Sequence, residues 1–353
     1  MKIAIIHNQF SRGGGMEAYM LALVKGFLAA GDELTVYTYE VDRYLAAQFP
    51  SCAIRQIQLP PLPRQWKKYL FLHKCNIDFN RAEYDISLSL TRTSCQDISV
   101  CGGVHPEMIK RVSRSSLFRW LHDKIEIACE RKMLATVPII MAHSQAIAQE
   151  IINNYEVDTG KIRVLYPPID TDKFVPSDSQ AIKETCAKFN ISPYKLTFLL
   201  PSCGHKRKGL QQLIAAFRLL DPSRFELLVA GGKLPREIPA NVRHIGYINN
   251  LAPLYSAVDY TILPSHYEPF GLVIPESLQC GTPVITTKDV GAAELLSKQD
   301  GILLDNNQPE TIATMIKKLS TPLPVAENFA NRHRLTITQH IADIKALYPL
   351  VRL

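Results

Sequence analysis

The sequence predicts an α/β protein with two doubly wound parallel sheets, and three observations lead to this fold class. Short runs of β-branched and apolar residues alternate along the chain with amphipathic stretches of helical length. The chain of 353 residues is long for one core and comfortable for two domains of roughly 150–180 residues. Its hydrophobic content of 46% and charged content of 21% are ordinary for a globular protein, so disorder is excluded as the main state.

The apolar runs place the strands, and the amphipathic stretches between them place the helices. In the first half, strands are expected at Lys2–Ile6, Glu33–Thr38, Ile86–Leu90, Asp97–Cys101 and Pro138–Ala142. In the second half, they are expected at Thr197–Pro201, Glu226–Ala230, Val242–Ile245, Tyr260–Leu263, Pro283–Thr286 and Gly301–Leu304. A helix should run from Glu17 to Ala30 and end at Gly31, and another should cover Leu210–Leu219.

The connection between the two halves is expected at a proline pair. Pro167 and Pro168 block the continuation of a helix and stiffen the connector from Val164 to Asp170. We therefore predict one domain over residues 1–165 and a second over residues 166–332, with a last helix over residues 333–353.

Composition excludes several classes of function. The net charge of +7, from 40 basic and 33 acidic residues, agrees with an anionic ligand or membrane surface but is too small to argue for nucleic acid. The eight cysteines include no Cys-x-x-Cys pair, so reduced structural thiols are expected and a zinc site is not. No apolar run approaches the ~20 residues of a membrane span, and no signal peptide is apparent, so a cytosolic protein is expected.

The most informative segment contains two carboxylates, Glu268 and Glu276, eight positions apart. Glu276 follows a proline in the first turn of a predicted helix, where proline and acidic residues are favoured. Backbone N–H groups at the start of this helix should face an anion, and the two carboxylates should accept hydrogen bonds from hydroxyl groups. These N–H groups belong to Gly271, Leu272 and Val273. A nucleotide-sugar carries both phosphate and hydroxyl groups, so it is a ligand that fits this segment.

A basic run, Arg207-Lys208-Gly209, follows the first strand of the second half. A solvated charge cluster is the usual explanation, but the carboxyl edge of a parallel sheet is where α/β proteins bind ligands. Cleavage of a sugar–diphosphate bond leaves negative charge on the β-phosphate. One well-aimed donor stabilises such charge by ~3–4 kcal/mol, so neither Mg²⁺ nor another cofactor is expected.

Two features of the first half are also candidates for a site. The Gly13-Gly14-Gly15 turn precedes the first helix, although it departs from G-x-G-x-x-G and no acidic residue for an adenosine ribose follows. A flexible turn remains the alternative for this run. His105 follows another strand and two glycines, and a structural role is the alternative for a lone histidine.

These motifs resemble retaining glycosyltransferase family 4, whose members have the two-domain GT-B fold. Glu268 to Glu276 is similar to the Glu-x7-Glu signature, and Arg207-Lys208-Gly209 to a variant of Arg-x-x-x-Lys-Gly. The proline connector is similar to the crossover of the family. The resemblance is strongest over residues 200–305 and thinner over residues 1–165. It implies two Rossmann-like domains facing across a cleft and a last helix, around His333–Leu347, that packs back on the first domain.

The resemblance also implies roles for these residues. Arg207 and Lys208 bind the donor diphosphate, Glu276 binds the ribose, and Glu268 binds the transferred sugar. From the first domain, Gly14 and Gly15 face the diphosphate, and His105 meets the sugar. Further donor contacts are implied at Glu294, whose segment has Ala292 in place of a glycine, and at Tyr247 and Ile248 beside the base, where ordinary packing of Tyr247 is an alternative.

The expected function is transfer of a hexose from a nucleoside-diphosphate sugar, of UDP-glucose type, with retention. By family resemblance, the acceptor is a saccharide or lipid-linked molecule in bacterial lipopolysaccharide or surface-glycan synthesis. Front-face attack is favoured over a covalent intermediate on Glu268, since Glu276 is expected at the ribose and leaves no acid partner. A GDP-mannose-type transferase and a non-catalytic nucleotide-sugar binder remain alternatives. The hypothesis of a nucleic-acid-binding protein rests only on basic patches.

Two basic segments, residues 64–74 and 110–132, suggest peripheral contact with an anionic membrane. At helical spacing Trp66, Tyr69 and His73 share one face of the first segment, with Lys67 and Lys68 opposite. Ordinary solvated helices are the alternative. Many members of the resembled family act on lipid-linked acceptors, which favours the inner face of the cytoplasmic membrane.

Overall fold

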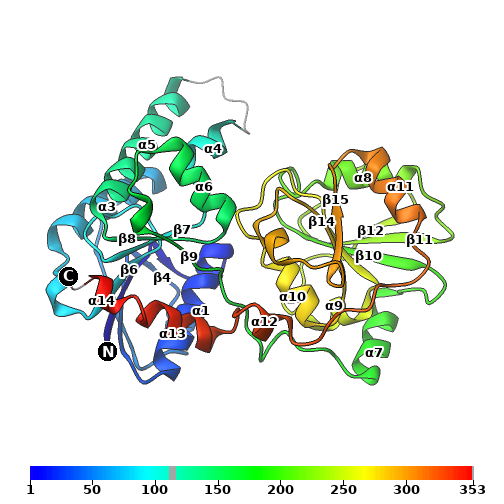
Figure 1. Ribbon diagram of the computed structural model, residues 1–353, viewed down its shortest axis with the longest axis horizontal. Coiled ribbons are helices and arrows are strands. Elements are labelled where there is room, and N and C mark those ends of the chain that lie inside the picture. The colour runs from blue at the N-terminus through cyan, green and yellow to red at the C-terminus, as the bar shows by residue number, and fades with distance from the viewer. Residues whose placement is uncertain (111–116, 352–353) are drawn as a thin grey trace. The chain divides into compact units, whose positions relative to one another are not determined.

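The computed structural model describes residues 1–110 and 117–351 and divides the chain into two compact units. Unit 1 comprises Met1–Pro168 together with the chain from Ile337 onwards, and unit 2 comprises Ile169–Thr336. The division therefore falls three residues beyond the expected end of the first domain. In each unit, helices flank a central sheet (Figure 1).

Unit 1 contains a seven-stranded parallel sheet in the order β5-β3-β1-β6-β7-β8-β9. Its strands are β1 (Lys2–Ile6), β3 (Glu33–Thr38), β5 (Cys52–Gln56), β6 (Ile86–Ser89), β7 (Ile98–Cys101), β8 (Ile139–Ala142) and β9 (Ile162–Val164). A short pair is formed by β2 (Gln9–Phe10) and β4 (Glu40–Val41). The helices are α1 (Gly15–Ala29), α2 (Arg43–Ala46), α3 (Arg64–Asp78), α4 (His105–Lys110), α5 (Leu117–Thr136), α6 (Gln145–Asn154), α13 (Ile337–Lys345) and α14 (Tyr348–Val351). Single 3₁₀ turns lie at Arg81–Glu83 and Thr159–Lys161.

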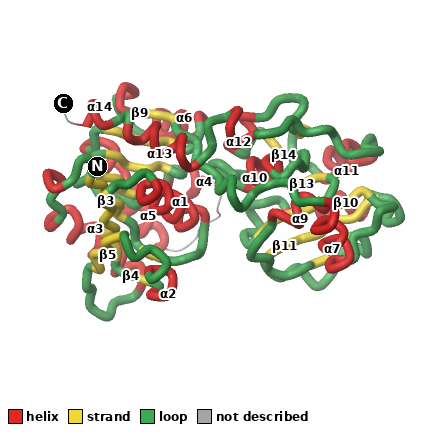
Figure 2. The backbone as a smooth tube through the Cα atoms, turned by 90° about the horizontal axis from the view of Figure 1, so that it is seen from below, coloured by secondary structure: helices red, strands yellow, loops and turns green. Residues whose placement is uncertain are grey.

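The end of the chain packs on the first helix of unit 1. Helices α13 and α1 lie side by side in both ribbon and tube views (Figures 1 and 2). A Cβ atom at Gly26 would lie 2.5 Å from Ile341 Cγ1, so the glycine permits this close approach. Buried His340 lies with its Nε2 2.7 Å from the hydroxyl of Tyr19, which satisfies both polar groups inside the contact.

Unit 2 contains a six-stranded parallel sheet in the order β12-β11-β10-β13-β14-β15. The strands are β10 (Leu196–Ser202), β11 (Phe225–Gly231), β12 (Val242–His244), β13 (Tyr260–Leu263), β14 (Val284–Thr287) and β15 (Gly301–Leu304). The helices are α7 (Ser179–Phe189), α8 (Leu210–Arg218), α9 (Ala252–Ala257), α10 (Val273–Gln279), α11 (Pro309–Lys317) and α12 (Phe329–Arg332), with a 3₁₀ turn at Gly291–Leu295. The chain leaves β10 in one direction along the sheet and returns to its other side at β13. The point where strand order reverses is the ligand-binding position in open α/β sheets.

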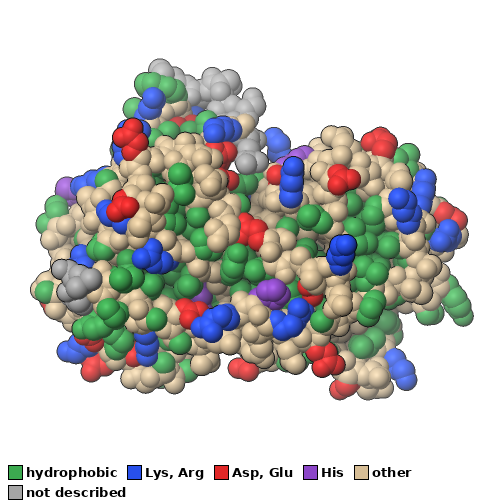
Figure 3. Space-filling model, viewed as in Figure 1, with side chains coloured by type: hydrophobic (Ala, Val, Ile, Leu, Met, Phe, Trp, Pro, Cys, Tyr) green, Lys and Arg blue, Asp and Glu red, His purple; other side chains and the backbone are tan. Residues whose placement is uncertain are grey.

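Every strand expected from the sequence is present within one or two residues at either end, and four strands were not expected: β2, β4, β5 and β9. Among the described residues, no helix is both long enough and apolar enough to cross a bilayer. Lys and Arg side chains are interspersed with Asp and Glu on the face shown in Figure 3. This mixture agrees with the modest net charge and gives no broad basic surface on that face.

Candidate active site

The candidate site of unit 2 is built by the loops that follow β10 and β13. Gly209 ends the first loop with φ +77°, a conformation that favours glycine. A Cβ atom there would lie 2.3 Å from the backbone oxygen of Pro264 in the second loop. The N–H of His266 donates to the carbonyl oxygen of Arg207 at 3.0 Å and joins the loops again. The two loops therefore form one rigid edge at the point where strand order reverses.

Replacement of Gly209 by alanine is expected to destabilise unit 2 by at least about 2 kcal/mol, from the left-handed backbone and the clash with a carbonyl oxygen. The matched control is Gly204→Ala in the same loop, where an added Cβ meets no atom within 4 Å. Thermal denaturation should show a lower midpoint for Gly209→Ala alone. Equal midpoints for both variants would contradict the close contact between the loops.

An ion pair joins the two loops. Arg207 Nη1 lies 2.6 Å from Glu268 Oε2, and the same nitrogen donates to the carbonyl oxygen of Tyr267 at 3.1 Å. The Glu268 side chain is 13% exposed, whereas that of Arg207 is 44% exposed. The backbone of Glu268 is fixed by Asp289 and Gly291 through hydrogen bonds of 3.0 and 2.9 Å. A sheltered carboxylate thus stands beside a guanidinium group that remains accessible to solvent.

Lys208 is a half-buried cation behind this ion pair. Its Nζ donates to the carbonyl oxygen of Pro201 at 3.0 Å. Burial lowers the pKa of Lys208, while the nearby charges of Glu268 and Glu276 act in the opposite direction. The lysine charge is therefore poorly solvated, and an added anion would stabilise it strongly.

Glu276 lies in the first turn of α10, as the sequence predicted. Its Oε2 accepts a hydrogen bond from the hydroxyl of Tyr255 at 3.0 Å. Burial raises the pKa of Glu276, and the effect outweighs the opposing contributions of Tyr255, Lys173 and Lys208. Tyr255 and Lys173 were not predicted from the sequence. The position of Lys173 just after the proline connector could have pointed to it. The sequence around Tyr255 gave no such indication, because it is typical of a core residue.

The raised pKa predicts that Glu276→Gln makes the ligand-free protein more stable near neutral pH. For a group whose pKa is raised by folding, the associated stability is present at low pH and is lost as pH rises through the folded-state pKa. Glutamine carries no charge and removes that loss. The difference in stability between Glu276→Gln and the wild type should therefore vanish below about pH 4, where Glu276 is protonated in both the folded and the unfolded protein. Melting temperatures across pH test this, with exposed Glu310→Gln as the control.

The same substitution should weaken nucleotide binding by about tenfold, since a hydrogen bond to a charged group contributes ~1.5–3 kcal/mol. Titration of UDP into both variants measures this effect. A Glu276→Gln protein with unchanged stability and unchanged UDP affinity would contradict both the burial argument and the ribose role.

The segment between the two carboxylates forms a tight turn. Gly271 has φ +89°, and a Cβ atom there would approach Val290 to 2.8 Å. Leu272 and Val273 lie at the amino end of α10. Whether their N–H groups and that of Gly271 bind an anion stays a prediction. The 3₁₀ turn that carries exposed Glu294 lies against this segment, because the N–H of Ala292 donates to Phe270 at 2.7 Å.

The residues expected beside the base lie after β12. Gly246 accepts a hydrogen bond from Gly231, at the carboxyl end of β11, at 2.7 Å. The Tyr247 side chain is 72% exposed, so core packing does not explain this aromatic residue. Ile248 packs against the buried cluster that includes Tyr255. These contacts bring the segment into the neighbourhood of the residue that holds Glu276.

In unit 1, the glycine-rich turn leads directly into α1. Gly14 is the N-cap, Gly15 is the first helical residue, and a Cβ atom at Gly15 would meet nothing within 4 Å. Glu17 lies in the first turn, and its carboxylate is 3.8 Å from His7 Nε2. Interaction with His7 lowers the pKa of Glu17 to about 2. A negative charge at this helix start opposes phosphate binding, so the expected diphosphate contact remains a prediction with an electrostatic cost.

His105 begins α4 and is 5% exposed. Its Nε2 lies 2.8 Å from Asp123 Oδ1, and its backbone N–H donates to Glu130 Oε2 at 2.8 Å. Tyr155 and Arg92 also donate to Glu130. Two carboxylates from α5 therefore fix both the ring and the backbone of His105, which sequence analysis did not anticipate.

Within the described ranges, one group of side chains has donor atoms close enough to hold a metal ion: His105, His122 and Asp123, within 4.8 Å of one another. The expectation that no metal is needed rests on Arg207 and Lys208 and stays a prediction. It overlooked an Asp-x-Asp pattern at Asp170-Thr171-Asp172. The Asp170 carboxylate accepts from the N–H of Lys173 at 3.2 Å, which is a local turn contact.

The structure corrects one part of the expected membrane segments. Lys68 is not a solvated cation, because its Nζ lies 2.5 Å from the buried carboxylate of Glu126. The buried face of α3 carries Phe71, Leu72 and Cys75, and Trp66 is 49% exposed. Within the second segment, residues 111–116 lie outside the described part of the chain.

Two family models match the chain. One, described as "Glycosyltransferase Family 4", covers residues 13–173, and the other, described as "Glycosyl transferases group 1", covers residues 182–336. A probable transglycosylase of Burkholderia thailandensis is 32% identical over 84% of this chain and 80% of its own length. A D-inositol 3-phosphate glycosyltransferase of Corynebacterium jeikeium is 28% identical over 54% of this chain and 51% of its own length.

Solved structures share the fold. WaaG, a glycosyltransferase involved in lipopolysaccharide biosynthesis, superposes with a TM-score of 0.74 and 18% identity over 99% of this chain and 97% of its own. Anabaena Alr3699/HepE, in complex with UDP and glucose, also superposes with a TM-score of 0.74 and 18% identity, over 98% of this chain and 99% of its own. At this identity, the likeness establishes the architecture of the two parallel-sheet units.

Proposed function

The chain belongs to glycosyltransferase family 4 of the GT-B fold, and on that premise we propose that it is a retaining hexosyltransferase acting without a metal ion. The donor is a nucleoside-diphosphate sugar of UDP-glucose type. The acceptor is a saccharide or lipid-linked molecule in bacterial lipopolysaccharide or surface-glycan synthesis. The proposal for the donor and pathway follows what is stated of HepE and WaaG.

One observation carries the proposal. Two cations, Arg207 and Lys208, and two carboxylates, Glu268 and Glu276, come together at the strand-order reversal of unit 2. Phosphate needs the cations, and sugar hydroxyl groups need the carboxylates. A purely structural ion-pair network explains less well why Arg207 remains 44% exposed while its partner is sheltered.

Donor binding would exchange one partner of Arg207 for another. The diphosphate attracts Arg207 away from Glu268, and the released carboxylate then accepts hydrogen bonds from the sugar. Guanidinium can hold two phosphate oxygens at once, whereas the Lys208 ammonium acts as a point charge. Both donors are prepositioned for the charge that develops on the leaving β-phosphate, which is how such groups accelerate transfer.

The transfer proceeds in one step, without a covalent intermediate on the enzyme. The bond between the anomeric carbon and the phosphate oxygen breaks, and the acceptor oxygen forms its bond on the same face of the sugar. The acceptor proton passes to the leaving diphosphate, which carries the electron pair of the broken bond. Unit 1 supplies the acceptor contacts in this proposal, with His105 as a hydrogen-bonding group held by Asp123.

A thermal-shift panel of UDP, GDP, ADP and their common sugar conjugates tests the proposal. A ligand at about ten times its dissociation constant adds ~1.4 kcal/mol of stability, worth roughly 3–5 °C for a domain of this size. A shift confined to uracil nucleotides supports the UDP-glucose-type donor, and one confined to guanine nucleotides favours the mannosyltransferase alternative. Binding without donor hydrolysis or transfer would indicate a non-catalytic binder. No shift with any nucleotide would overturn the proposal.

We also propose that the protein is cytoplasmic and touches an anionic bilayer peripherally through α3 and the segment 110–132. The support is that exposed Trp66 and Trp120 lie on these elements. Cosedimentation with anionic and neutral vesicles tests this partner separately from the transfer reaction. Equal recovery with both vesicle types would exclude the electrostatic contact.

A further inference from the structure

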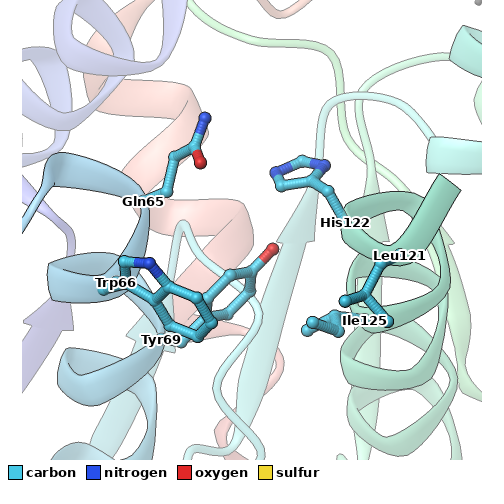
Figure 4. Close-up of a pocket in the computed structure, with 6 residues that line it drawn as sticks. All are labelled: Gln65, Trp66, Tyr69, Leu121, His122 and Ile125. Atoms are coloured by element: carbon cyan, nitrogen blue, oxygen red, sulfur yellow. The ribbon is translucent and has the colours of Figure 1, made fainter. Parts of the chain in front are cut away.

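A pocket in unit 1 lies between α3 and α5. Figure 4 shows side chains from the two helices facing each other across it. The pocket is lined by Gln65, Trp66, Tyr69, Leu121, His122 and Ile125. It is a shallow pocket, open to solvent on one side, and the surface that lines it is largely apolar.

The Tyr69 ring, in the aromatic wall of the pocket, is held in place by a buried carboxylate. The hydroxyl of Tyr69 donates to Glu126 Oε1 at 2.8 Å. Glu126 is 2% exposed and also pairs with Lys68 at 2.5 Å and Arg92 at 2.8 Å. Burial alone would raise the pKa of Glu126, but Arg92 and Lys68 outweigh it and hold that pKa at about 2. The carboxylate thus stays charged and anchors the tyrosine ring.

The opposite wall supplies hydrogen-bonding capacity. His122 Nδ1 lies 3.7 Å from Asp123 and its Nε2 lies 3.7 Å from Glu126, both too far for a direct hydrogen bond. Among the residues that the structure describes, the imidazole therefore retains capacity for a ligand. The amide of Gln65 and the indole N–H of half-exposed Trp66 add polar groups on the other wall.

The pocket is continuous with His105. Ring centroids are separated by 6.4 Å from Trp66 to Tyr69, by 6.2 Å from Tyr69 to His122, and by 6.1 Å from His122 to His105. His105 and His122 also approach the same oxygen of Asp123, at 2.8 and 3.7 Å. The pocket thus lies next to the residue of unit 1 assigned to the transferred sugar.

We propose that this pocket binds a neutral hexopyranose ring of the acceptor, an inference that rests on the proposed transferase function. The C–H face of a pyranose packs on the electron-rich face of an aromatic ring, here Trp66 or Tyr69. Its hydroxyl groups meet His122 and Gln65. Lys68, whose Nζ lies 5.7 Å from the centroid of the Tyr69 ring, is already paired with Glu126 and so offers little to an anionic lipid headgroup.

The chain has only two tryptophans, which gives a direct test. In Trp120→Phe, Trp66 is the sole tryptophan emitter. In Trp66→Phe, the emitter is Trp120, which lies on α5 but does not line the pocket. Methyl α- and β-glycosides of glucose, galactose and mannose are titrated into both proteins, alongside vesicles of anionic phospholipid. At least one glycoside should change the emission of Trp120→Phe saturably and leave Trp66→Phe unchanged.

No saturable change with any glycoside, or a change with vesicles alone, would overturn the proposal. A change in both variants would place the sugar elsewhere and overturn it equally. In turnover assays, Trp66→Ala should raise the acceptor KM about tenfold, equivalent to ~1.4 kcal/mol, and leave UDP affinity unchanged. Because the fluorescence titration needs no donor, it separates failure of this site from failure of the transferase function, which the nucleotide panel measures.

Discussion

Replacement of Glu268 by glutamine is expected to lower turnover about 10²–10³-fold, the range for loss of one prepositioned electrostatic group. UDP affinity should stay within about threefold of the wild-type value, because the carboxylate is assigned to the sugar and not to the nucleotide. Glutamine has almost the same shape, and the backbone bonds of Glu268 to Asp289 and Gly291 do not depend on its charge. The loop should therefore keep its conformation.

The structure adds a further expectation for this variant. Loss of the charge frees Arg207 from an ion pair of 2.6 Å, so the diphosphate no longer competes for the guanidinium group. Any change in UDP affinity should therefore be a small increase. Measurements of kcat and of UDP binding on Glu268→Gln, with exposed Glu310→Gln as the control, test the argument. An equal loss of turnover and UDP affinity would assign Glu268 to the nucleotide and contradict its sugar role.

The strands that the sequence predicted best are those whose burial is complete. The predicted bounds of β13 agree with the structure, and all four of its residues are buried. Strand β5 was missed because only Cys52 is buried there, and its polar and charged residues do not have the pattern of a core strand. It lies at the sheet edge, where one side of the strand has no neighbour. Edge strands therefore give a weaker hydrophobic signal than central ones.

The pairing of Arg207 with Glu268 could be anticipated from topology, since both follow strands that are neighbours in a parallel sheet. The partners of Glu276 and His105 could not. Tyr255 reaches Glu276 from a different helix and differs from a core tyrosine only in its hydroxyl contact. Asp123 contacts His105 from 18 positions further along the chain, and no local sequence pattern predicts this contact. The partners that make such contacts can be identified only from the three-dimensional structure.

Replacement of Lys208 by methionine is expected to weaken UDP binding about 10–100-fold, since a hydrogen bond to a charged group contributes ~1.5–3 kcal/mol. Uridine lacks phosphate, so its affinity should not change. Lys208 lies in a half-buried position with a lowered pKa, where an added anion is less screened by water than at an exposed lysine. The effect on UDP should therefore persist at high salt. Isothermal titration with UDP and uridine at two salt concentrations measures both expectations.

The neighbouring residue gives a matched control, because Lys206 in the same run is exposed. Lys206→Met removes one charge from the loop, and its small effect on UDP binding should disappear in high salt. Bound diphosphate should raise the pKa of Lys208, so binding is fully supported below the free-protein pKa and weakens as pH rises through the bound-state value. The alkaline loss of UDP affinity should be present in wild type and Lys206→Met and absent in Lys208→Met. If both lysine variants lost UDP affinity equally and only at low salt, the basic run would be a solvated charge cluster, and Lys208 would have no place on the leaving phosphate.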